Sequence, residues 1–94
     1  MSHNLQKYIS QREEVLDKVR YILIENLHVR RTPDEIDPDT PLFGSGLGLD
    51  SVDAVELLVC LETEFRVRIP NDSAGRSSMR TLNTVVDLVL HYKR

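Results

Sequence analysis

The sequence predicts an all-α fold with three substantial helices, one short helix and a long loop between the first two. Three segments repeat apolar residues about every 3.6 positions, as the buried face of an amphipathic helix does. Prolines and glycines gather between the first two segments, at positions 33 to 48. The chain has 94 residues, enough for one domain over residues 1–94 with a single, mostly aliphatic core.

The first helix is expected to begin at Ser10, with residues 1–9 as a looser N-terminal extension. Ser10 and Glu13 have the spacing of a capping box, which marks a helix start. The helix should end near His28, because Pro33 disfavours helical geometry at the residue before it. Its periodic apolar positions are Leu5, Tyr8, Ile9, Val15, Leu16, Val19, Ile22, Leu23 and Leu27.

Residues 30–50 are expected to form a long structured loop. Three prolines and three glycines in this stretch prevent a sustained helix or strand. Ile36, Leu42, Phe43 and Leu47 are apolar enough to hold the loop on the core. A loop of this length in a small domain is often functional.

The second helix is expected from Asp50 or Ser51 to Phe65, with Asp50 as its N-cap. Its core face contains Ala54, Leu57, Leu58, Leu61 and Phe65. A second apolar stripe contains Val52, Val55 and Val59. One core needs only one face, so either another helix or a partner should cover the second stripe.

The rest of the chain predicts a connector and two further helices. Residues 66–70 alternate basic and apolar residues, but a lone strand has nothing to pair with, so we expect an extended connector. Residues 71–75 are expected to form one short helical turn. Thr81 should cap a last helix that runs through Leu82, Val85, Val86, Val89 and Leu90 to Tyr92.

Charge is distributed unevenly along the chain, although the net charge is only −3. Residues 32–65 contain nine acids and no lysine or arginine, whereas residues 66–94 contain six cations and two acids. An acidic middle disfavours nucleic acid as a partner and favours basic protein surfaces. We expect no membrane span and no signal peptide, and the single cysteine, Cys60, excludes an internal disulfide and fits the cytoplasm.

Ser51 is the candidate functional residue. It follows a glycine-rich approach, and Asp50 already fills the capping role, so its hydroxyl is left free. No histidine has sequence support as a base, and Leu49 and Asp53 stand where a hydrolase elbow needs glycines. A phosphate-binding loop, a calcium loop at residues 37–42 and a zinc site all fail on residue type or spacing. The serine is therefore expected to be modified by another protein and not to catalyse.

Residues 47–57, followed by Leu61-Glu62-Thr63-Glu64-Phe65 and Ile69-Pro70, resemble the acyl carrier proteins. The likeness covers about residues 12–92. It implies a non-enzymatic four-helix bundle with a short third helix. It also implies that Ser51 receives covalent 4′-phosphopantetheine from coenzyme A through a separate phosphopantetheinyl transferase. The arm's thiol would then carry acyl groups as thioesters, in fatty acid, specialised lipid or polyketide-type biosynthesis.

The resemblance also implies partners with basic docking surfaces, namely the transferase and the acyl-loading and acyl-processing enzymes. The expected contact residues are Asp50, Val52, Asp53, Val55, Glu56, Val59 and Glu62. The cargo would be shielded between the helices, among Leu57, Leu61 and Val85, and the carrier is expected to be a monomer. Two alternatives remain open: an aminoacyl or peptidyl carrier, and an unmodified helical adaptor.

Overall fold

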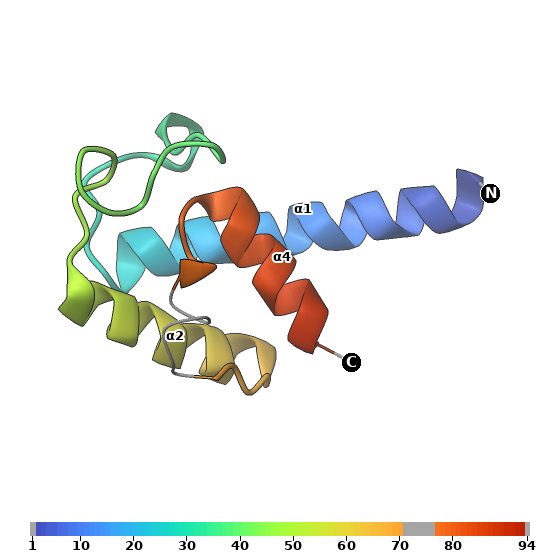
Figure 1. The fold of residues 1–94 in the computed structure, drawn as a ribbon. Coiled ribbons are helices and arrows are strands. Elements are labelled where there is room, and N and C mark those ends of the chain that lie inside the picture. The colour runs from blue at the N-terminus through green and yellow to red at the C-terminus, as the bar shows by residue number, and fades with distance from the viewer. Residues whose placement is uncertain (1, 71–76, 94) are drawn as a thin grey trace.

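A computed structural model describes residues 2–70 and 77–93, with side chains from Leu5 onward (Figure 1). These residues form three α-helices, α1 (Ser2–Glu25), α2 (Ser51–Phe65) and α4 (Leu82–Tyr92), and a 3₁₀ helix, η1 (Pro33–Glu35). Apart from two isolated bridges, the described residues pair no strands. The all-α prediction is therefore confirmed for this part of the chain. The short helix predicted at residues 71–75 lies outside the described residues.

Helix α1 begins at Ser2, so the prediction of a start at Ser10 is wrong. Ser10 lies inside a continuous helix, because no proline or glycine among residues 2–9 interrupts it. The first turns project beyond the other helices, and Leu5, Tyr8 and Ile9 are exposed there (Figure 1). The predicted end was close, since the helix ends at Glu25 and His28 takes a left-handed conformation with φ of 60°.

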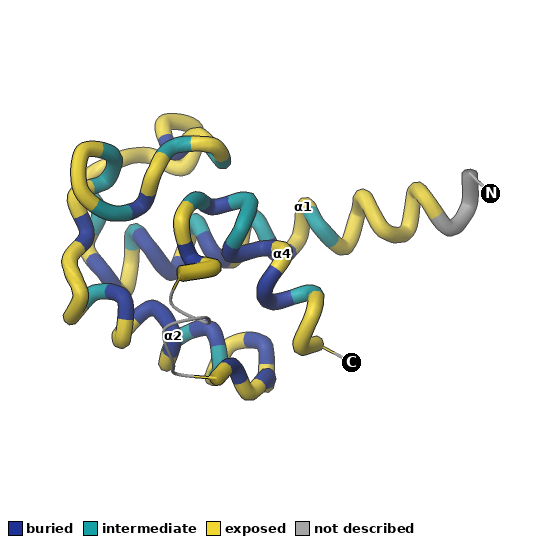
Figure 2. The backbone as a smooth tube through the Cα atoms, in the orientation of Figure 1, coloured by how far each residue is buried: buried dark blue, intermediate teal, exposed yellow. Residues whose placement is uncertain are grey.

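One apolar core joins the three helices, and no buried residue in the described chain is polar or charged (Figure 2). Helix α1 contributes its second half, while α2 contributes the predicted face and α4 most of its length. The predicted core face of α2 is confirmed, because Ala54, Leu57, Leu58, Leu61 and Phe65 are all buried. The core therefore depends on apolar packing, and polar chemistry is left to the surface.

The last helix and the connector before it also follow the sequence. Thr81 caps α4, and its hydroxyl accepts a hydrogen bond from the Thr84 backbone N–H at 3.3 Å. Residues 67–70 are extended, with Val67 and Ile69 buried. The Glu62 carboxylate accepts the Ile69 backbone N–H at 3.0 Å, which attaches the connector to α2.

The long loop is held against the start of α4 and delivers the chain to α2. The Leu42 N–H donates to the Arg80 carbonyl at 2.9 Å, and the Leu49 N–H donates to the Leu42 carbonyl at 3.0 Å. Ile36 and Leu42 are buried in the core, and Phe43 is half-buried. These contacts fix residues 41–49, and so they fix where α2 begins.

Candidate functional site

Ser51 is the first residue of α2, and its side chain is exposed. The Asp50 carboxylate accepts the Asp53 N–H at 2.9 Å, and the Asp53 carboxylate accepts the Asp50 N–H at 3.0 Å. This reciprocal pair is a capping box, so Asp50 fills the capping role as predicted. The Ser51 hydroxyl is not needed for the cap, and within the described residues it makes no hydrogen bond.

The cap also places a stable negative charge beside the serine. The hydrogen bond from the Asp53 backbone N–H holds the pKa of Asp50 below its ordinary value of 3.8. Asp50 is therefore ionised at neutral pH. A cation on an approaching protein meets a fixed carboxylate directly beside the hydroxyl.

Ser51 lines two open hollows. The first is lined by Phe43, Leu49, Asp50, Ser51 and Ala54, and the second by Ser51, Val52, Val55 and Glu56. No histidine or lysine is among these residues, so the imidazole or amine base that ordinarily activates a catalytic serine is missing from them. An exposed hydroxyl on an open, largely apolar surface fits esterification by a group that another protein delivers.

The second apolar stripe of α2 lies uncovered. Val52 is 72% exposed, Val55 41% and Val59 54%, so within the described chain no helix covers them. We call Val52, Val55, Glu56 and Val59 the docking face. Of the other expected contact residues, Asp50 is exposed at one end, whereas Asp53 and Glu62 are half-buried. Each of these three carboxylates also accepts a backbone N–H, so only Glu56 is uncommitted.

Three basic residues near this site were missed from the sequence. His28, Arg30 and Arg31 line a third hollow together with Leu27, Val29, Leu47, Gly48, Leu49 and Asp53. Arg30 and Arg31 directly precede the acidic run of residues 32–65 and were therefore counted apart from it. In the sequence, the only indication that these arginines lie near the site is their position immediately before the acidic run. Their place beside Asp53 becomes visible only in the folded chain.

The interior that we expected to shield a cargo is closed. Leu57, Leu61 and Val85 are fully buried and belong to the shared core. An acyl chain could enter there only if α2 and α4 moved apart.

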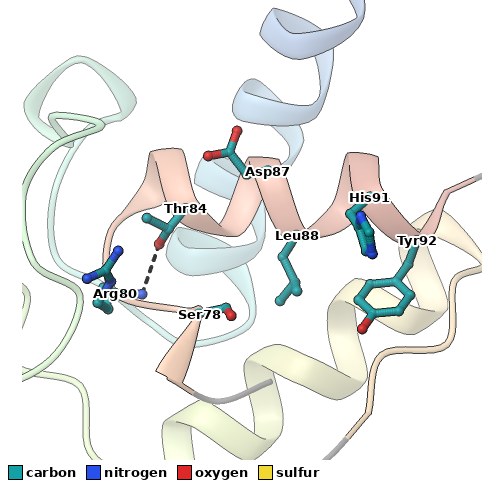
Figure 3. Close-up of a pocket in the computed structure, with 7 residues that line it drawn as sticks. All are labelled: Ser78, Arg80, Thr84, Asp87, Leu88, His91 and Tyr92. Carbon is teal, nitrogen blue, oxygen red and sulfur yellow. Dashed lines mark hydrogen bonds between the residues drawn. The ribbon is translucent and has the colours of Figure 1, made fainter. Parts of the chain in front are cut away.

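A separate hollow lies along α4, and Figure 3 shows its lining. The Arg80 N–H donates to the Thr84 hydroxyl at 2.9 Å, Asp87 pairs with Arg12, and the rings of His91 and Tyr92 meet edge to face at 4.8 Å. This hollow shares no residue with the two at Ser51, so we do not include it in the candidate site.

Among the described residues, no group of three or more histidine, cysteine, aspartate or glutamate side chains is arranged to hold a metal ion. None of the helices described is both long and apolar enough to cross a membrane.

Comparison with known proteins matches residues 17–91 to the family described as "Phosphopantetheine attachment site". An acyl carrier protein of Cyanidioschyzon merolae is 38% identical over 82 residues, which are 87% of this chain and 85% of the relative. One from Thermosynechococcus vestitus is 37% identical over 76 residues, or 81% of this chain and 88% of the relative. Such proteins are carriers and not enzymes, and 4′-phosphopantetheine is their covalently attached cofactor. The chain belongs to the acyl carrier proteins, the family of phosphopantetheine-binding carriers.

Proposed function

We propose that Ser51 is the attachment residue for 4′-phosphopantetheine and that the chain carries acyl groups between enzymes. The observation that carries the proposal is the exposed Ser51 hydroxyl at the start of α2, which the cap leaves uncommitted. When bound, the group supplies a terminal thiol that holds acyl groups as thioesters. The pathway we propose is fatty acid, specialised lipid or polyketide-type biosynthesis.

The surrounding residues present the hydroxyl and keep it accessible. Asp50 and Asp53 fix the first turn of α2, so the serine faces outward in one orientation. Phe43, Leu49 and Ala54 offer apolar surface on one side, against which the methyl and methylene groups of the arm can rest. Ser51 is the one residue of the chain that takes part in the chemical step: its Oγ forms a phosphodiester with the phosphopantetheinyl group of coenzyme A, and the adenosine bisphosphate half of coenzyme A leaves. The transferase supplies the remaining catalytic groups.

The docking face supports weak, repeated contact with several enzymes. Its three valines give a small apolar centre, and Asp50 and Glu56 supply negative charge beside them. Such charge raises association rates with basic surfaces without requiring a large interface. The partners that fit are the phosphopantetheinyl transferase and the acyl-loading and acyl-processing enzymes, which would bind one carrier monomer at a time.

Three finer expectations belong to the same proposal. We take residues 1–94 as one carrier domain of the four-helix type, and the shared core of α1, α2 and α4 supports this. The single free cysteine supports a reducing compartment such as the cytoplasm. An aminoacyl or peptidyl carrier would use the same serine, so only the enzyme that loads the thiol separates it from an acyl carrier.

The test is to incubate the chain with coenzyme A, magnesium and a broad-specificity phosphopantetheinyl transferase and to measure intact mass. We expect a gain of one phosphopantetheinyl group that Ser51→Ala abolishes. The matched control is Ser45→Ala, which removes another exposed hydroxyl, from the loop that precedes α2, and should still gain the group. If the wild type gains nothing, the unmodified adaptor is favoured. A gain on the Ser51→Ala variant would refute the residue assignment.

A further inference from the structure

The hollow lined by His28, Arg30 and Arg31 borders the docking face on the edge away from Ser51. Asp53, which lines this hollow, lies about 200° around α2 from Ser51 at 100° per residue. Val52 and Glu56 lie between these two edges on the exposed side. A protein that covers the docking face and reaches Ser51 therefore lies next to the hollow, which has a volume of about 430 Å³. We call it the arginine hollow.

The turn after α1 fixes the position of these cations. The Leu27 N–H donates to the Ile22 carbonyl at 3.2 Å, and the Val29 N–H donates to the Leu23 carbonyl at 3.0 Å. With His28 in the left-handed conformation, these bonds turn the chain back toward the start of α2. Arg30 and Arg31 come directly after this turn, so the path of the backbone brings both residues to the hollow.

Neither Arg30 nor Arg31 is among the ion pairs of the described residues, and both are exposed, although the Asp53 carboxylate also lines the hollow. Arg31 does help to lower the pKa of Glu35, after the hydrogen bonds from Thr32, but that carboxylate is bound to the Thr32 N–H at 2.8 Å. Asp53 is likewise bound to the Asp50 N–H. Both of these carboxylates accept a backbone N–H and neither forms an ion pair with an arginine, so the two guanidinium groups can still pair with a further anion.

We propose that the arginine hollow receives a carboxylate of the enzyme that docks on α2, so the chain selects partners of mixed charge. The proposal rests on the proposed function, because the docking enzyme is the one that modifies Ser51. A guanidinium offers paired N–H donors that match a carboxylate, and a hollow excludes part of the competing water. A uniformly basic partner would instead be repelled by Arg30 and Arg31.

Reversing the charge of Arg30 or Arg31 should slow modification if a partner carboxylate binds in the hollow. The same reversal should speed modification if the partner is uniformly basic, so the two cases can be told apart. We would measure kcat/KM for Ser51 modification by the transferase at low salt, with carrier concentration varied, for Arg30→Glu and Arg31→Glu. The matched control is Lys7→Glu, which changes net charge equally on the exposed start of α1. Circular dichroism would establish that each variant keeps the helix content of the wild type.

We expect each arginine reversal to lower kcat/KM about tenfold through KM, with the loss shrinking at higher salt. Arg30→Lys should have a kcat/KM between those of the wild type and Arg30→Glu, because lysine keeps the charge but lacks the paired N–H donors. Lys7→Glu should match the wild type. If Arg30→Glu and Arg31→Glu are modified as fast as Lys7→Glu, or faster, the proposal is wrong. That result differs from failure of the proposed function, in which the wild-type chain is not modified at all.

Discussion

At the scale of single residues, two glycines of the long loop carry different constraints. A Cβ at Gly46 would lie 1.7 Å from the Pro41 carbonyl oxygen, a backbone atom that also accepts the Leu47 N–H at 3.0 Å. Gly44 has a φ of 67°, but nothing lies within 4 Å of a Cβ there. The loop therefore needs a glycine at 46 for space and at 44 only for its backbone conformation.

Gly46→Ala should destabilise the fold by about 3 kcal/mol, because the loop must move away from Pro41. Gly44→Ala should cost about 1 kcal/mol, the strain of a left-handed alanine. Urea denaturation of both variants measures the difference. Equal losses in the two variants would mean that the close approach at Gly46 is not rigid.

Residue-level predictions from sequence succeeded where the cause is local. Asp50 as the cap followed from its place before an apolar periodic run, and the structure bears it out. Arg30 and Arg31 were missed because their proximity to Asp53 depends on the turn at His28 and on the path of the loop. Distances between segments of this kind are set by tertiary packing, which local sequence does not encode.

At the scale of elements, the 15 residues of helix α2 form three distinct surfaces. One face closes the core, another leaves three valines exposed, and the first turn presents Ser51. The boundaries of α2 could be predicted because a good N-cap residue directly precedes a run of apolar residues with a 3.6-residue period. The start of α1 could not be predicted, because the spacing of Ser10 and Glu13 is equally compatible with a helix interior and no residue before it ends the helix.

The first turn of α2 should become less stable in acid because of Asp50. Its folded-state pKa lies below 3.8, so the folded protein binds the proton more weakly than the unfolded chain does. Ionised Asp50 makes its full contribution to folding stability above the pKa that it has in the unfolded chain. This contribution is lost as the pH falls through the lower pKa that Asp50 has in the folded protein. Asp50→Asn keeps a good cap but does not titrate.

The measurement is chemical denaturation of the wild type and of Asp50→Asn from neutral pH down into acid. The stability difference between the two proteins should narrow below about pH 4. Comparison with this variant removes the parallel contribution of Glu35, whose pKa is also lowered, chiefly by its hydrogen bond from the Thr32 N–H. A difference that stays constant with pH would show that the cap charge does not stabilise the helix.

At the scale of the molecule, the acidic run and the valine stripe become one surface at the start of α2. The sequence predicted this surface and the all-α core, because both follow from helical periodicity. It did not predict that Asp53 and Glu62 would bind backbone N–H groups. Glu56 is therefore the acid of the docking face whose carboxylate is uncommitted, so a cation of a partner can pair with it directly.

Glu56→Lys should slow association with the transferase about tenfold at low salt, because it reverses the charge beside the three valines of the docking face. The effect should shrink as salt shortens the range of the field. Stopped-flow association rates measure it, with Glu13→Lys on α1 as a control of equal charge change. An association rate that is the same for Glu56→Lys and Glu13→Lys would contradict acidic steering by α2.

The attachment residue itself can be located directly by tandem mass spectrometry of the modified chain. Trypsin cleaves after Arg31 and Arg66 and nowhere between them, because residues 32–65 contain no lysine or arginine. The resulting peptide contains two serines, Ser45 and Ser51. We predict that fragment ions place the phosphopantetheinyl group on Ser51. A group on Ser45, or on any other peptide of the chain, would contradict the account.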